Sequence, residues 1–131
     1  MLRIATIGTS MITDDFIQVV NANDQTTFVG TLSRDADRGA AFTAEHSGER
    51  NFTALDELAS ADDVDAVYIG SPNALHYEQA LACIAGGKHV IVEKPFCATE
   101  AQALEVFRAA EAAGVVALEA MRPLHDPAFH A

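Results

Sequence analysis

Cysteine and basic residues are scarce in this chain, and each shortage argues against certain classes of protein. The two cysteines, Cys83 and Cys97, form no CxxC motif, so we expect free structural thiols rather than a disulfide scaffold. Only 8 Lys and Arg residues stand against 19 Asp and Glu residues, which gives a formal net charge of −11. Because nucleic acids and anionic membranes both bind basic faces, we predict neither as a partner. An anionic cofactor would have to be held by local groups.

The sequence also lacks a long apolar run, a low-complexity tract and a secretory signal pattern. No window approaches the length of a transmembrane helix, and the first residues lead directly into a strand-like run. These absences favour a cytoplasmic protein. Half of the 131 residues are apolar and 21% are charged, as is usual for a soluble globular domain. The length suits one domain, which buries roughly two thirds of its unfolded surface.

Short apolar runs alternate with segments of helical spacing. The runs are rich in Val and Ile and predict buried parallel strands at residues 2–7, 27–32, 66–69, 89–92 and 115–118. Between the first two runs, a helix is predicted to bury the stripe Ile12, Phe16, Val19 and Val20, and a second helix to cover residues 36–45. This alternation predicts right-handed crossovers and a single α/β domain: a doubly wound, mostly parallel, Rossmann-like sheet with helices on both faces.

The later helices carry recognisable end signals. Capping boxes are predicted at Thr53-x-x-Asp56 and at Thr99-x-x-Gln102. Asn73 is predicted to cap the helix that follows the run at 66–69, and Gly114 to close the last helix. Neither an internal repeat nor a linker interrupts these elements.

A glycine turn follows the first predicted strand. Gly8-x-Ser10-x-x-Thr13 stands where a dinucleotide fingerprint has G-x-G-x-x-G, so it keeps the tight-turn glycine and replaces the other two. Ser10 is small, and its hydroxyl could donate to a phosphate at the positive end of the next helix. The residues assigned to cofactor binding in this turn are Gly8, Thr9, Ser10, Met11 and Ile12. A plain strand-to-helix turn is the alternative.

The second predicted strand ends in Ser33-Arg34, where a cofactor without a 2′-phosphate usually meets an acidic side chain. A serine and an arginine suit a 2′-phosphate better than a ribose hydroxyl, and Arg38 lies one helical turn later. These residues predict NADP in preference to NAD. The alternative is that both arginines are solvated and balance Asp35 and Asp37.

Polar residues also follow the predicted strand at 66–69. Ser71 and Asn73 lie where they can touch a ligand on the carboxyl edge of the sheet, and His76 follows one turn later. On their own, Asn73 is more often a helix cap and His76 more often solvated. No helical His pair or Cys/His spacing supports a metal site, so none is predicted.

Glu93-Lys94-Pro95 is the most informative motif of the sequence. It follows the apolar run at 89–92, so an acid and an amine stand where a buried strand leaves the sheet. The Lys94 amine could donate to a substrate oxygen or exchange a proton, and we predict it to be catalytic. A surface Glu-Lys pair is the alternative, but it does not explain why the charges follow a buried strand so closely.

Three segments in this order resemble the Gfo/Idh/MocA oxidoreductase family: Ser71-Pro72-Asn73-x-x-His76, Gly86-Gly87-Lys88-His89-Val90 and Glu93-Lys94-Pro95. The resemblance implies hydride transfer between NADP or NAD and a hydroxyl carbon of a sugar, polyol or related small molecule. It implies that Ser71, Asn73 and His76 line the cofactor groove and that Glu93 lies near the nicotinamide ribose. Lys94 would reach cofactor and substrate, and Arg122 would lie near the nicotinamide end.

The chain departs from the family in two respects. Its fingerprint lacks two glycines, and family members are usually more than twice as long, with a second domain that contacts the substrate. We expect residues 1–120 to form a dinucleotide-binding domain and 121–131 to begin the connection to an absent substrate domain. Such a chain should bind cofactor without turnover and self-associate as a homo-oligomer. The alternatives are a non-catalytic NAD(P)-sensing or regulatory protein and a degenerate assembly module.

Overall fold

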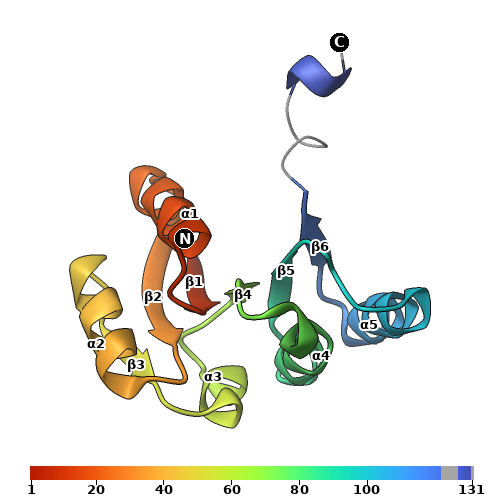
Figure 1. Ribbon diagram of the computed structural model, residues 1–131, viewed down its shortest axis with the longest axis horizontal. Coiled ribbons are helices and arrows are strands. Elements are labelled where there is room, and N and C mark those ends of the chain that lie inside the picture. The colour runs from red at the N-terminus through yellow and green to blue at the C-terminus, as the bar shows by residue number, and fades with distance from the viewer. Residues whose placement is uncertain (122–126, 131) are drawn as a thin grey trace.

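The computed structural model describes residues 1–121 and 127–130, and its centre is one parallel sheet (Figure 1). The sheet has six strands in the order β3-β2-β1-β4-β5-β6. Their bounds are β1 (Leu2–Ile7), β2 (Thr26–Leu32), β3 (Arg50–Phe52), β4 (Ala66–Ile69), β5 (His89–Glu93) and β6 (Ala117–Ala120). The order reverses at β1, which pairs with β2 on one side and β4 on the other, so the predicted doubly wound α/β fold is confirmed.

Helices cover both faces of the sheet, as right-handed crossovers in two opposite directions require. They are α1 (Met11–Ala22), α2 (Ala36–Glu45), α3 (Leu55–Ser60), α4 (His76–Ala85) and α5 (Glu100–Ala113), with 3-10 turns η1 (Asn73–Leu75) and η2 (Pro127–His130). In Figure 1, α1 lies above the sheet and α3, α4 and α5 lie below it. Among the described residues, no helix is both long and apolar enough to span a membrane.

The core is divided by the sheet into two clusters. The smaller cluster packs α1 and α2 against β1, β2 and β4, with Ile17, Phe28 and Phe42 among its members. The larger packs the other face against α3, α4 and α5, and includes Val67 and Val106. Because both faces of the central strands are buried, these strands read as continuous apolar runs in the sequence.

One strand was not predicted, and another begins later than predicted. β3 is absent from the predictions because only one of its three residues, Phe52, is apolar, so no run marks it. β6 begins two residues later than the run predicted at 115–118. Gly114 ends α5 in the left-handed conformation (φ 70°), and the Val115 N–H still donates to the Ala110 carbonyl at 3.0 Å. The last turn of α5 therefore uses residues that the apolar pattern assigned to the strand.

The buried face of α1 matches the predicted stripe only at Val20. The helix buries Thr13, Ile17 and Val20, whereas Val19 is 66% exposed. Ile12 and Phe16 are only half-buried. Thr13 takes a core position because its hydroxyl lies 3.2 Å from that of Ser10, which satisfies it without water.

Of the three predicted N-terminal caps, two fail and one holds. The box at Thr99-x-x-Gln102 is confirmed, because Thr99 Oγ1 accepts from the Gln102 N–H at 3.2 Å. The box between Thr53 and Asp56 is wrong, since Thr53 bonds to Glu57 instead. Asn73 opens the 3-10 turn η1 and caps neither it nor α4 with its side chain.

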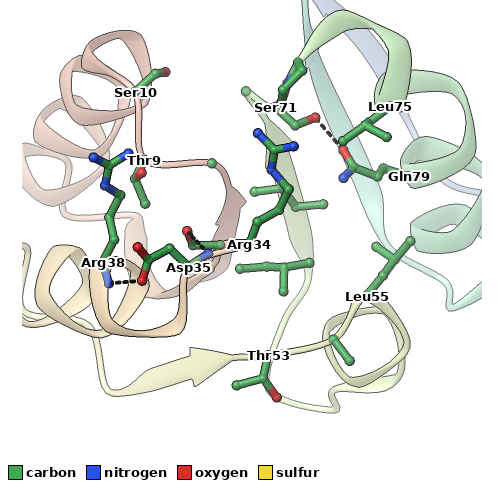
Figure 2. A pocket seen from close by; sticks show the side chains of 17 residues that line it. Thr9, Ser10, Arg34, Asp35, Arg38, Thr53, Leu55, Ser71, Leu75 and Gln79 are labelled. Carbon is green, nitrogen blue, oxygen red and sulfur yellow. Dashed lines mark hydrogen bonds between the residues drawn. The ribbon is translucent and has the colours of Figure 1, made fainter.

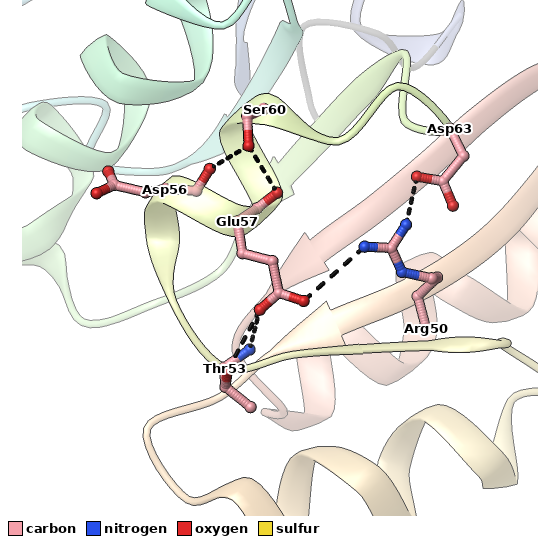
Figure 3. Close-up of polar contacts among 6 residues, drawn as sticks. All are labelled: Arg50, Thr53, Asp56, Glu57, Ser60 and Asp63. Atoms are coloured by element: carbon pink, nitrogen blue, oxygen red, sulfur yellow. Dashed lines mark hydrogen bonds and ion pairs between the residues drawn. The ribbon is translucent and has the colours of Figure 1, made fainter.

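An ion-pair network holds the short strand β3 to α3 (Figure 3). Arg50 Nη1 donates to Asp63 Oδ1 at 2.7 Å, and its Nη2 lies 3.8 Å from Glu57 Oε1. The Glu57 carboxylate also accepts from the Thr53 N–H at 3.1 Å and from its hydroxyl at 3.2 Å. Partly exposed pairs of this kind add little stability. Their effect is to set the path of residues 53–55, which line the groove described below.

Candidate functional site

A groove of about 450 Å³ opens at the carboxyl edge of the sheet, where the strand order reverses (Figure 2). Four loops line it: those that follow β1, β2, β3 and β4. Of the predicted binding residues, it brings together Gly8, Thr9, Ser10, Ser33, Arg34, Arg38 and Ser71. The groove thus lies where open α/β sheets bind their ligands.

The turn after β1 is shaped by Gly8. Its φ of +103° disfavours any residue with a side chain, and a Cβ there would lie 2.8 Å from the Gly70 carbonyl oxygen. Ser10 is the N-cap of α1, yet its side chain makes no capping hydrogen bond to the helix. The N-terminus of α1 therefore has no side-chain cap from Ser10, and Ser10 itself lines the groove, so an anion could occupy this helix end.

Thr13, which replaces the third fingerprint glycine, fits because its neighbour is small. A Cβ on Gly70 would lie only 2.5 Å from Thr13 Oγ1. Close packing of this helix against the sheet therefore depends on Gly70, which follows β4, and not on a glycine in α1. Thr13 can therefore occupy this position because residue 70 has no side chain.

Arg34 and Arg38 bring positive charge to the end of β2. In Figure 2, both side chains point toward the side of the groove on which Ser10 and Ser71 lie. The Asp35 carboxylate accepts from the Arg38 backbone N–H at 3.1 Å and so caps α2. Among the described residues, neither guanidinium group belongs to an ion pair. Two exposed, unpaired cations at this position are suited to binding a phosphate.

The far wall of the groove comes from the loop after β4 and from α4. Ser71 Oγ donates to Gln79 Oε1 at 2.5 Å, and Leu75 lies beside them. Sequence reasoning missed Gln79 and Leu75 together with Thr53 and Leu55 on the opposite side. Gln79 lies three residues beyond His76 on the same face of α4, so helical spacing could have indicated it.

His76 lies behind this wall and not in the groove. The side chain is fully buried, with Nδ1 2.9 Å from the Pro95 carbonyl oxygen and Nε2 2.9 Å from the Ser71 carbonyl oxygen. Asn73, in contrast, is exposed and does not line the groove. Of the three residues assigned to the groove after β4, the structure places only Ser71 there.

Glu93 lines a second, smaller cavity of about 160 Å³ on the α1 side of the sheet. Tyr68 donates from its hydroxyl to Glu93 Oε1 at 2.5 Å, and its ring stacks on Phe16 with 4.0 Å between centroids. Ile12 and Ile91 also line this cavity. The Glu93 carboxylate is thereby held in one orientation at the end of β5.

Lys94 is exposed and follows Glu93 directly, with a cis peptide bond to Pro95. Its backbone N–H donates to Glu93 Oε2 at 3.3 Å. Met11 is 82% exposed. Neither Lys94 nor Met11 lines either cavity, and Arg122 lies outside the described residues.

A cluster of potential metal ligands lies outside the groove lining. Asp14 on α1, Glu45 at the end of α2 and the adjacent His46 have ligand atoms within 4.8 Å of one another. His46 Nε2 lies 2.7 Å from Asp14 Oδ1 without the alignment of a hydrogen bond, and Gln18 donates to the other Asp14 oxygen at 2.7 Å. The His46 ring also packs 4.7 Å from that of Phe42. We assign the cluster to the contact between α1 and α2.

Comparison with known proteins gives consistent matches over nearly the whole chain. Residues 2–120 match the family model of Gfo/Idh/MocA oxidoreductases, described as an oxidoreductase family with an NAD-binding Rossmann fold. The NADP-dependent scyllo-inositol 2-dehydrogenase of Bacillus subtilis (strain 168) is 43% identical over 98% of this chain. The 3-ketoreductase of Actinomadura kijaniata, solved with NADP and TDP-benzene, superposes over 98% of this chain with a TM-score of 0.92 and 32% identity.

An NAD-binding oxidoreductase from Klebsiella pneumoniae superposes equally well, with a TM-score of 0.92, 31% identity and 98% of this chain covered. The chain nevertheless covers only part of each relative: 39% of the dehydrogenase, 41% of the ketoreductase and 36% of the Klebsiella protein. It spans about two fifths of the length of the proteins it matches. The match of sequence and topology leaves one assignment: the chain belongs to the Gfo/Idh/MocA oxidoreductase family and corresponds to its NAD-binding Rossmann fold.

Proposed function

We propose that the groove binds NADP, with the adenosine 2′-phosphate at Ser33, Arg34 and Arg38. The observation that carries this proposal is the pair of arginines near the end of β2, which have no ion-pair partner in the part of the chain that the structure describes. An acidic residue there would favour the free ribose hydroxyl of NAD. The B. subtilis relative is named as NADP-dependent, and the A. kijaniata enzyme was solved with NADP, which supports the same preference.

The pyrophosphate is assigned to the turn at Gly8, Thr9 and Ser10, where the N-terminus of α1 attracts negative charge. Ser71 lies across the groove from this turn, so the nicotinamide end is assigned to the region beyond it, toward Glu93 and Lys94. A bound nicotinamide supplies hydride chemistry. The chain's part is to orient the ring and to place the Lys94 amine where it can donate to a substrate oxygen or exchange its proton.

The test is calorimetric titration of the chain with NADP and with NAD. Replacing Arg34 or Arg38 with Ala should weaken NADP binding about tenfold or more, because each removes a charge-assisted hydrogen bond of about 1.5–3 kcal/mol. NAD binding should stay within about twofold. Arg108→Ala, on the exposed face of α5, is the matched control and should change neither. Equal affinity of the unmodified chain for NADP and NAD would contradict the proposal.

The whole protein is proposed to be an oxidoreductase that acts on a hydroxyl group of a sugar, polyol or related molecule in the cytoplasm. The inositol dehydrogenase from B. subtilis supports the substrate class. Because this chain spans about two fifths of such relatives, we expect it to bind cofactor and not to turn over. Residues 1–120 are proposed as the dinucleotide-binding domain, with 121–131 beginning the connection to a substrate domain.

Turnover is tested by following the absorbance of reduced cofactor while polyols are supplied with NADP. The 131-residue chain should give no signal above background. A longer protein that begins with this chain should oxidise a polyol, and Lys94→Met in that protein should lower kcat about a hundredfold or more, as loss of a general acid–base group does. Cofactor binding without turnover in the longer protein would favour a sensor or regulatory role.

A further inference from the structure

The buried ring of His76 faces two carbonyl groups that belong to different loops. His76 is the first residue of α4 and is fully buried. Its Nε2 lies 2.9 Å from the carbonyl oxygen of Ser71, in the loop after β4. Its Nδ1 lies 2.9 Å from the carbonyl oxygen of Pro95, in the loop after β5. Ser71 lines the groove and Pro95 follows Lys94, so one side chain connects the two regions assigned to cofactor and substrate.

Carbonyl oxygens accept hydrogen bonds and cannot donate them. A neutral imidazole has one N–H donor and one lone-pair nitrogen, so it could satisfy only one of the two carbonyls. Its lone pair would then face the other carbonyl oxygen at 2.9 Å, in a site closed to water. A ring that carries a proton on both nitrogens satisfies both carbonyls at once.

We propose that His76 is a positioning residue that donates a hydrogen bond from each ring nitrogen, as a buried imidazolium that fastens the Ser71 loop to the loop carrying Lys94 and Pro95. Hydrogen bonds from a charged donor are roughly twice as strong as neutral ones, which offsets part of the loss of hydration.

The inference depends on the proposed function only for its effect on cofactor binding. Gln79 holds Ser71 by the side chain at 2.5 Å, whereas His76 holds it by the backbone carbonyl, so the two contacts fix the same loop from different atoms. The other ring nitrogen of His76 holds the carbonyl of Pro95, the residue after Lys94. We call the two contacts of this ring the His76 bridge. Loss of the bridge should therefore change both the groove wall and the position of the amine.

The direct test is nitrogen-15 NMR of the imidazole rings in the 131-residue chain at neutral pH. The spectrum of His76→Gln identifies the His76 signals by their loss. Two nitrogens with the chemical shifts of protonated imidazolium, each bearing a slowly exchanging proton, are the expected result. A lone-pair nitrogen signal from His76 at neutral pH would overturn the proposal, whether or not the chain binds any dinucleotide.

The positioning role is tested by NADP titration of His76→Gln and His89→Gln. His89 accepts from the Val116 N–H at 3.0 Å at the amino edge of the sheet, so it is a matched histidine away from the groove. His76→Gln should weaken NADP binding about tenfold while circular dichroism shows the fold intact, and His89→Gln should not. Equal effects of the two substitutions would remove the positioning role. If no variant and no unmodified chain binds NADP, the proposed function fails and the ring spectrum still decides the protonation of His76.

Discussion

Gly86 and Lys88, two residues of the family motif, lie at the amino edge of the sheet, opposite the groove. A Cβ on Gly86 would stand 1.9 Å from the Ala59 carbonyl oxygen, so only glycine allows this approach. Lys88 is buried and donates from Nζ to the Ala61 carbonyl at 2.5 Å. Both residues fasten the turn between α4 and β5 to the chain near the end of α3. Packing accounts for this part of the motif. Lys94 is therefore the lysine of the motif that lies at the carboxyl edge of the sheet.

The two cysteines are free, as the sequence predicted. Cys83 lies in the core on α4, and burial raises the pKa of its thiol to about 12. Burial also raises the pKa of the half-buried Cys97 thiol. Since the thiolate is the reactive form, both residues are suited to packing and neither to nucleophilic chemistry.

Asp65 makes the free energy of unfolding depend on pH in the acidic range. The Arg3 side chain donates to both of its carboxylate oxygens, at 2.8 and 3.0 Å, and holds the Asp65 pKa at about 2. Because the folded-state pKa is depressed, the contribution is present above the unfolded value near 4 and is lost as the pH falls toward 2. Arg3→Met should therefore lower the free energy of unfolding at neutral pH, and the difference should vanish in acid.

Urea unfolding of both proteins across this pH range measures the effect. Arg108→Met is the control, since this arginine has no ion pair among the described residues. A destabilisation by Arg3→Met that persists unchanged at pH 2 would show that lost packing, and not the ion pair, is responsible.

At the residue scale, the groove was predictable where its chemistry is local. Gly8, Ser10 and Arg34 each lie shortly after the end of a strand, so their place on the carboxyl edge depends only on identifying that strand. Gln79 reaches the groove through the packing of α4, and only its spacing of three residues from His76 marks it. His76 shows the same limit, because its burial depends on the loop after β5, 19 residues away in sequence.

At the element scale, apolar runs located the central strands well because both of their faces are buried. The edge strands β3 and β6 were harder, since edge strands are short and only partly covered. The predicted stripe of α1 held only at Val20, for a related reason. Ile12, Phe16 and Val19 form an apolar face, but they line the cavity beside Tyr68 while a hydrogen-bonded threonine takes the core position. Periodicity therefore identified the helix and not the face that packs.

The cap of α5 gives a prediction at this scale. Thr99 is exposed, so replacing its side chain opens no cavity and the lost bond to the Gln102 N–H dominates the effect. Thr99→Ala should lower the free energy of unfolding by about 1 kcal/mol. Thr99→Ser keeps the hydroxyl and should stay within about 0.5 kcal/mol of the unmodified chain. Thermal and urea unfolding measure both, and equal losses in the two variants would contradict the cap as the cause.

At the scale of the whole molecule, the described residues cover one face of the sheet incompletely. Tyr68, Ile91 and Leu118 occupy the same register on β4, β5 and β6. Their exposure rises across the sheet, because Phe16 of α1 stacks on Tyr68 while Leu118 is 45% exposed. An apolar row that emerges into solvent in this way is typical of a surface that another segment or chain covers.

The prediction of a homo-oligomer is tested at this row. In a chain that spans two fifths of its relatives' length, we expect a second copy to cover Leu118 and Ile91, although the net charge of −11 weakens association at low salt. Leu118→Glu should weaken self-association about tenfold or more, since burying a leucine contributes about 1.5–3 kcal/mol. Leu104→Glu, at a residue 44% exposed on α5 across the sheet, is the control. Sedimentation at physiological salt decides: a monomer at high concentration, or equal effects of both substitutions, would contradict pairing through this face.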